Sequence, residues 1–145
     1  MNHLEGTKTV VGSAVATSEA TTALLRLDTL GFDYASVDVV YGPVLAAGTA
    51  SAAAQVLTLK HSDAATTGYD VITGYPTIVA PTAAASSSVS SVIRMDVDMR
   101  GKKRYLEVAS SPNTAATVSI VARVGKGEEH PTSAAGKGVI GAFSG

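Results

Sequence analysis

The chain of 145 residues has no cysteine and no tryptophan, and aromatic residues make up only 5% of it. Without cysteine there is no disulfide, no thiolate nucleophile and no cysteine metal site. Because aromatic side chains bury the most area each, a core made mainly of Val, Leu, Ile and Ala is thin. Small cores usually gain stability from partners or from oligomerisation, and we expect the same here.

No segment approaches the roughly 18 consecutive apolar residues that a membrane-spanning helix requires. Residues 1–20 lack the basic stretch and apolar run of a signal peptide, so we expect synthesis in the cytoplasm without secretion. The 11 basic and 12 acidic residues give a formal net charge of −1. Nucleic-acid binders normally carry a basic excess. The sequence therefore predicts a protein that binds neither membrane nor nucleic acid.

Period-two alternation of apolar and polar residues dominates the middle of the chain. It is clearest over residues 92–100, where apolar side chains share one face and charged side chains share the other. Residues 105–108 and 117–124 alternate in the same way. The pattern is typical of half-buried antiparallel strands. The core residues predicted from these three stretches are Ile93, Met95, Val97, Met99, Leu106, Val108, Val118, Ile120, Ala122 and Val124.

Weaker strand patterns occupy 22–29, 36–41, 55–61, 69–72 and 77–80, with Gly- and Pro-containing turns between them. Short strands at this spacing indicate an all-β sandwich or barrel.

The two ends of the chain differ from its middle in composition. We assign residues 21–124 to one β-sandwich domain, residues 1–20 to an N-terminal arm and the Gly-rich residues 125–145 to a C-terminal arm, because neither end carries enough apolar surface for a core. In the C-terminal arm, a small apolar cluster is predicted to dock on the domain or on a neighbour: Val139, Ile140 and Phe143.

No catalytic, cofactor or metal site is predicted. His3 and His130 fall in the two arms, and His61 ends a strand without a recognisable nucleophile nearby. The two Gly-Lys-Gly triplets at 125–127 and 136–138 fail the phosphate-loop pattern, which requires Ser or Thr after the Lys and a following helix. We therefore expect a protein that is not an enzyme.

The stretch VDMRGKKRYLEV, residues 97–108, places four cations at the end of a predicted hairpin: Arg100, Lys102, Lys103 and Arg104. Only Asp98 and Glu107 are close enough in sequence to pair with them. Two interpretations are open. The excess charge keeps the turn soluble, or it contacts an acidic patch on a partner and steers binding.

The carboxylates Asp96, Asp98 and Glu107 are predicted on the outward face of adjacent strands. A pair of carboxylates in a cleft is typical of a glycosidase. Interleaved with arginines across a hairpin, they are better explained as solvated cross-strand ion pairs. Carbohydrate binding through exposed rings is a second possibility, although the five tyrosines do not share one strand spacing.

The stretch RMDVDMRGKKRYLEVASSPNTAATVSIVARVGKGEEHP, residues 94–131, resembles the small decoration, or cement, proteins of tailed-bacteriophage capsids. In these, an alternating strand leads to a basic Arg-Gly turn, a Tyr-Leu strand, a Thr/Val-rich strand and a tail. The resemblance implies a β-sandwich, specifically a jelly roll, that binds the major capsid protein on the outer capsid surface and stabilises the shell. It also implies a homotrimer. The alternative function is a carbohydrate-binding or fibre-like adhesin module.

Overall fold

The computed structural model describes residues 7–12, 15–17, 22–42, 56–75, 78–79, 90–111 and 116–127. These residues form ten strands and no helix. The strands are β1 (Lys8–Val11), β2 (Val15–Thr17), β3 (Ala23–Asp28), β4 (Phe32–Tyr41), β5 (Val56–Ser62), β6 (Asp70–Val71), β7 (Ile78–Val79), β8 (Ser91–Asp98), β9 (Tyr105–Ser111) and β10 (Ala116–Gly127).

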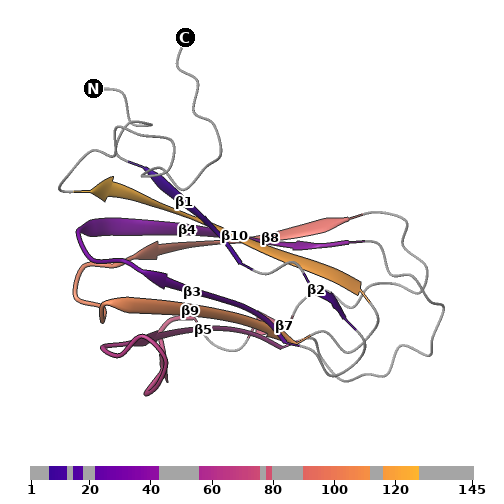
Figure 1. Cartoon of the computed structure of the whole chain (residues 1–145), viewed down its shortest axis with the longest axis horizontal. Coiled ribbons are helices and arrows are strands. Elements are labelled where there is room, and N and C mark those ends of the chain that lie inside the picture. Colours follow the sequence, from indigo (N-terminus) through magenta and orange to yellow (C-terminus); the bar gives the residue numbers. More distant parts are fainter. Residues whose placement is uncertain are drawn as a thin grey trace, which may run out of the picture.

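The strands form two antiparallel sheets that face each other as the two layers of a sandwich (Figure 1). Sheet A has the order β1-β10-β4-β8. The strand β2 also pairs with β10, on the side away from β4, because Val118 of β10 pairs with Tyr41 of β4 on one side and with Val15 of β2 on the other. β1 and β2 therefore lie on the same side of β10. Sheet B has the order β3-β9-β5-β6, with β7 beside β5. The predicted all-β antiparallel sandwich is confirmed.

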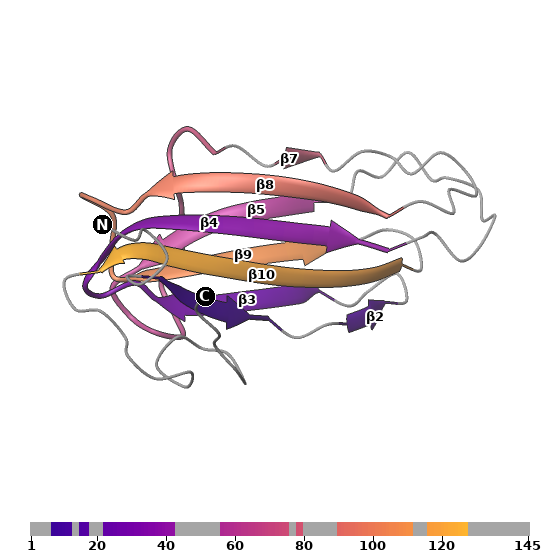
Figure 2. The same cartoon turned by 90° about the horizontal axis from the view of Figure 1, so that it is seen from above.

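Strand pairing is nested along the chain. β1 and β2 pair with β10, β3 with β9, β4 with β8, and β5 with β6 and β7. The contacts of β10 with β4 and of β9 with β5 then complete the two sheets. Figure 2 shows the consequence from above, where β8, β4 and β10 lie over β5, β9 and β3. The chain therefore passes from one sheet to the other at most of its turns.

The core lies between the sheets and follows the predicted alternation. Nine of the ten predicted core residues are buried, and the tenth, Ile93, is half-buried against the same cluster. Tyr41 crosses from sheet A to sheet B, where its hydroxyl lies 2.9 Å from Ser110 Oγ. Burial raises the pKa of this phenol. A buried hydroxyl pair of this kind satisfies two polar groups that would otherwise be costly to enclose.

Within the predicted N-terminal arm, residues 8–11 and 15–17 instead form β1 and β2 at the edge of sheet A. Lys8 pairs with Val124 and Val15 with Val118. An edge strand needs hydrogen-bonding partners on one side only, and Val10 packs against the core, so a weak apolar pattern is sufficient. The predicted end of the domain also shifts, because β10 continues to Gly127 opposite Phe32. The cluster of Val139, Ile140 and Phe143 lies outside the described residues.

Candidate interaction surface at one end of the sandwich

The basic stretch forms a turn between the sheets and not the hairpin that the sequence predicted. β8 pairs with β4 in sheet A, whereas β9 pairs with β3 and β5 in sheet B. The β8–β9 turn, residues 99–104, therefore crosses one end of the sandwich. We call this the turn end, which also carries the β3–β4 turn (29–31) and the loop 63–69 after β5 (Figure 1).

Hydrogen bonds from neighbouring strands fix the backbone of the β8–β9 turn. The Lys103 N–H donates to His61 Nδ1 at 3.2 Å. The Arg104 carbonyl accepts from both the backbone N–H and the hydroxyl of Thr29, at 3.0 and 2.6 Å. Gly101 has φ 76°, a conformation in which a Cβ is strained. Hydrogen bonds to sheet B and to the β3–β4 turn therefore fix the backbone that carries the four cations.

Two arginines of the turn are held by carboxylates and aromatic rings. Arg100 binds Asp98 through Nε and Nη2 at 3.0 and 2.7 Å and lies 5.1 Å from the Tyr34 ring centre. These bonds lower the Asp98 pKa to about 2. Arg104 makes the same kind of two-point contact with Asp28, at 3.0 and 2.6 Å, and lies over the Tyr105 ring at 5.0 Å. Planar two-point pairs of this kind restrict the guanidinium orientation.

The two lysines differ. Lys103 Nζ lies 2.7 Å from Asp70 in β6, and this bond raises the Lys103 pKa. Lys102 forms no ion pair with any described residue and is exposed. Three of the four turn cations are therefore neutralised, two of them by aspartates distant in sequence, Asp28 and Asp70. The predicted excess of positive charge is reduced to one lysine.

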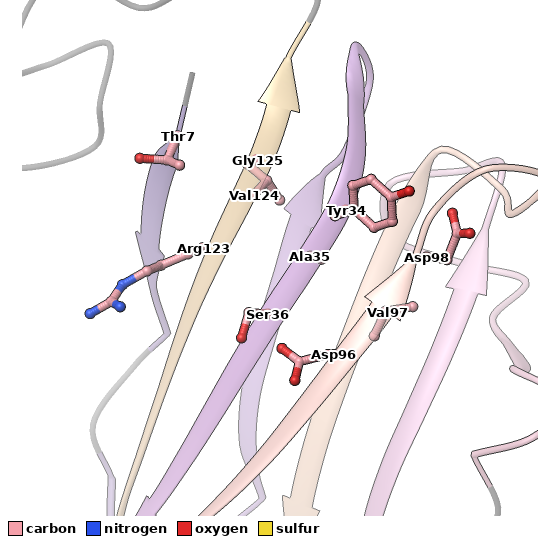
Figure 3. A pocket seen from close by; sticks show the side chains of 10 residues that line it. All are labelled: Thr7, Tyr34, Ala35, Ser36, Asp96, Val97, Asp98, Arg123, Val124 and Gly125. Carbon is pink, nitrogen blue, oxygen red and sulfur yellow. The ribbon is translucent and has the colours of Figure 1, made fainter. Parts of the chain in front are cut away.

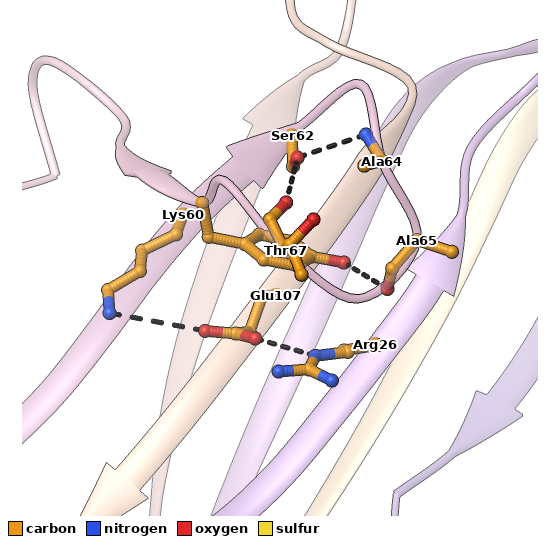
Figure 4. A network of polar contacts seen from close by, with 8 residues as sticks. Arg26, Lys60, Ser62, Ala64, Ala65, Thr67 and Glu107 are labelled. Atoms are coloured by element: carbon orange, nitrogen blue, oxygen red, sulfur yellow. Dashed lines mark hydrogen bonds and ion pairs between the residues drawn. The ribbon is translucent and has the colours of Figure 1, made fainter.

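Glu107, predicted as a partner of the turn cations, binds elsewhere. It points outward from sheet B, yet only 6% of it is exposed. Its carboxylate lies 2.7 Å from Arg26 Nε and 4.0 Å from Lys60 Nζ (Figure 4). Tyr69, at the end of the loop 63–69, lies over Arg26 at 5.2 Å from the ring centre. Glu107 therefore forms cross-strand ion pairs as predicted, but its carboxylate is buried and not solvated.

The loop 63–69 is fixed by its own hydrogen bonds. The buried Ser62 hydroxyl donates to the Thr67 carbonyl at 2.6 Å and accepts from the Ala64 N–H at 3.0 Å. The Tyr69 hydroxyl donates to the Ala65 carbonyl at 2.9 Å. This local network, visible in Figure 4, fixes the shape of the loop, and the Tyr69–Arg26 contact holds its end over the outer face of sheet B.

The outer face of sheet A carries an open groove of about 510 Å³ (Figure 3). It extends from Thr7, which precedes β1, across β10, β4 and β8, and its floor lies over small residues of the two central strands, Ser36 and Gly125. The full lining is Thr7, Tyr34, Ala35, Ser36, Asp96, Val97, Asp98, Arg123, Val124 and Gly125. Next to the groove, Arg94 binds Asp38 across the β4–β8 pair at 2.7 and 3.1 Å, a cross-strand pair of the predicted kind.

The turn end also contains features that the sequence pattern did not indicate. Leu30, at the β3–β4 turn, is 66% exposed. β1 begins and β10 ends here, so residues 128–145 follow Gly127 directly from this end. Neither feature has a sequence signal, because both depend on which strands lie side by side.

Histidines and carboxylates do not gather into a metal-binding group anywhere in the described ranges. His61 is partly buried near the end of β5, where its Nδ1 accepts from the Lys103 N–H, and His3 and His130 lie outside the described residues. No helix in the part of the chain that the structure describes is long and apolar enough to cross a membrane.

Comparison of the sequence with protein-family models finds no matching family, and comparison with curated proteins finds no match.

Proposed function

We propose that the chain is a capsid decoration protein: a structural virion component that binds the major capsid protein of a tailed phage on the outer capsid surface, as a homotrimer. The observation that carries the proposal is the turn end, a rigid surface of Arg–Tyr contacts. The sequence resemblance over residues 94–131 supplies the kind of partner.

The strand order supports the jelly roll that this class of protein implies. A jelly roll is a double sheet of eight strands built from two Greek keys. If β1 with β2, and β6 with β7, are each counted as one interrupted edge strand, eight strand positions remain. The first position (β1 with β2) pairs with the last (β10), the second (β3) with the second-last (β9), and the third (β4) with the third-last (β8). The two middle positions, β5 and β6 with β7, pair with each other. This nested pairing supports our proposal that the sandwich is a jelly roll.

The residue types at the turn end are those that dominate protein interfaces. Arg and Tyr are enriched in the residues that contribute most binding energy. Arg100 and Arg104 are already oriented by carboxylates and rings, so binding costs little further side-chain entropy. The exposed Leu30 adds an apolar contact beside them. Lys102, which forms no ion pair with any described residue, supplies long-range attraction to an acidic surface.

The C-terminal residues are the second contact in this proposal. Residues 128–145 follow β10 from the turn end and contain Val139, Ile140 and Phe143. Contacts from the β8–β9 turn and from this segment would then act together, and linked contacts gain affinity through effective concentration. In a trimer, three copies of the β8–β9 turn and three C-terminal segments would bind together and strengthen attachment further.

Co-sedimentation with empty shells of the phage that encodes the chain tests the proposal. We expect the full chain to pellet with shells and Lys102→Ser to bind more weakly with a smaller salt dependence, because one screened attraction is removed. Arg94→Ser is the matched control, since it removes one positive charge from sheet A away from the turn end. Wild-type protein that stays in the supernatant would contradict the function. Equal binding of the two variants would contradict the role of the turn end.

A further inference from the structure

We infer that the groove on the outer face of sheet A binds a neutral saccharide, a ligand separate from the proposed capsid partner. The groove lies on the face of the sandwich (Figure 3) and borders the turn end, since Tyr34 and Asp98 line the groove and also contact Arg100. Its chemistry is set by two rows of outward-facing residues that cross the strands.

One row offers hydrogen-bonding groups at regular spacing. Arg123, Ser36 and Asp96 are register partners on β10, β4 and β8. Neighbouring strands lie about 4.8 Å apart, so the row spans roughly 10 Å. Figure 3 shows Arg123 at the β1 side, Asp96 at the β8 side and Ser36 between them. From β10 to β8, the row thus presents a donor (Arg123), a hydroxyl (Ser36) and an acceptor (Asp96).

These groups are available to a ligand. Neither Arg123 nor Asp96 forms an ion pair with another described residue. No described residue makes a hydrogen bond to the Asp96 carboxylate; the Tyr75 hydroxyl donates to the Asp96 carbonyl, which is backbone. Sugar hydroxyls both donate and accept, so one ring can satisfy a carboxylate, a hydroxyl and a guanidinium at once.

The charge of the groove favours an uncharged ligand. Its formal charges are those of Asp96, Asp98 and Arg123, and Asp98 is already neutralised by Arg100. An anion entering the groove meets the Asp96 carboxylate, and a cation meets the Arg123 guanidinium. Desolvating an unmatched charge is costly in either case. A neutral polyhydroxyl ligand avoids both penalties.

The next row adds an apolar wall. Gly125, Tyr34 and Asp98 are register partners. Tyr34 is 38% exposed, and its position is supported by the Arg100 contact. Opposite it, Gly125 leaves the space that a side chain would fill. The Tyr34 ring can pack against the apolar C–H face of a sugar, while the neighbouring row of polar groups binds the sugar hydroxyls.

An extended peptide fits this position less well. Peptides that add to a sheet use the free N–H and C=O groups of an edge strand. The floor of the groove is formed by β10 and β4, which are both paired on their two sides. Their backbone groups are therefore occupied, and recognition depends on side chains alone.

Gly125→Phe tests the groove because the structure accepts a side chain there. A Cβ at Gly125 meets only Thr7 Cγ2, at 3.7 Å, and the backbone φ is outside the left-handed region. The added ring should fill the groove without unfolding the protein. Ser119→Phe is the matched control, because Ser119 lies on the outer face of β10 beside Val40 and outside the groove lining. Asp96→Ala removes the free acceptor without adding volume.

The full-length protein is first screened on a printed array of neutral, sialylated and sulfated oligosaccharides. The strongest neutral glycan is then titrated in soluble form by calorimetry. We expect binding of neutral glycans, at least about 10-fold weaker for Gly125→Phe and Asp96→Ala and unchanged for Ser119→Phe. Binding of no glycan, a preference for acidic glycans, or equal binding by Gly125→Phe and Ser119→Phe would each overturn the inference. Capsid co-sedimentation of Asp96→Ala should remain normal, because Asp96 makes no side-chain contact with the described residues of the turn end.

Discussion

The outer faces of the two sheets differ in accessibility, although both come from strands with the same alternation. Glu107 points outward from sheet B and is 6% exposed, with Arg26 and Lys60 bound to it. Asp96 points outward from sheet A and is exposed at the border of the groove. The loop 63–69 lies on sheet B, with Tyr69 over Arg26. A side chain that points outward from a sheet is therefore not necessarily in water.

The difference has a functional consequence. On sheet B the charged residues satisfy one another, so they contribute to stability and leave little for a partner. On sheet A the groove keeps Ser36, Asp96 and Arg123 available. We therefore propose ligand binding on sheet A and capsid attachment at the turn end, while the ion pairs of sheet B are structural.

The largest expected effect comes from removing the covered carboxylate. Glu107→Ala should lower the free energy of unfolding by about 1–3 kcal/mol, because the buried Glu107 carboxylate and its contacts with Arg26 and Lys60 are lost. Asp96→Ala should change it by less than about 0.5 kcal/mol, as is usual for exposed positions. Urea denaturation of both variants measures the difference. Equal costs would mean that the two faces are equally exposed.

Straining the loop on sheet B should have a somewhat smaller effect. Gly68 has φ 67°, so Gly68→Ala should cost about 1–2 kcal/mol of stability through backbone strain. Its Cβ would lie 3.6 Å from Ser62 Oγ, an ordinary contact, so no clash is added. Gly125→Ala on sheet A is the control and should be neutral or stabilising by about 0.5–1 kcal/mol. Thermal unfolding that ranks the two variants in the opposite order would contradict the assigned loop geometry.

The smallest expected effect is a pH dependence on the sheet B side. Burial, followed by the charges of Lys103 and Lys102, lowers the His61 pKa below 6.5, against weaker opposing effects of Asp70 and Asp63. The folded state favours neutral imidazole, so the unfolded chain binds the proton first as pH falls. Stability is then complete above about pH 6.5 and decreases as pH falls toward the folded-state pKa.

His61→Asn should flatten this part of the curve. Unfolding free energies of wild type and variant, measured between pH 7.5 and about pH 5, provide the test, and an NMR titration of His61 gives its pKa directly. A His61 pKa at or above 6.5 would contradict the hydrogen bond in which Nδ1 accepts from the Lys103 N–H.

Alternation in the sequence was sufficient for the inner faces of the strands. Val97, Leu106, Val118 and Ile120 are buried as predicted, because the period-two rule depends only on local backbone geometry. The edge formed by β1 and β2 was missed, since short edge strands depend on the partner strand more than on their own apolar content.

The candidate surfaces could be predicted only in part. The four cations of the β8–β9 turn were identified from their sequence, but their neutralisation by Asp28 and Asp70 was not, because both aspartates are distant in the chain. The turn was interpreted as a hairpin, and only the nested pairing places β8 and β9 in different sheets. The groove also depends on that pairing, since it brings Arg123, Ser36 and Asp96 into one row.

Carbodiimide labelling of carboxylates, read by mass spectrometry, tests the difference between the two faces most directly. Asp96 and Glu107 are labelled on the folded full-length protein, and each rate is normalised to the rate in the urea-unfolded chain. We expect Asp96 to react at a rate close to its unfolded rate. Glu107 should be strongly protected, and Gly68→Ala should reduce that protection because it strains the loop. Equal protection of Asp96 and Glu107 in the folded protein would contradict the account.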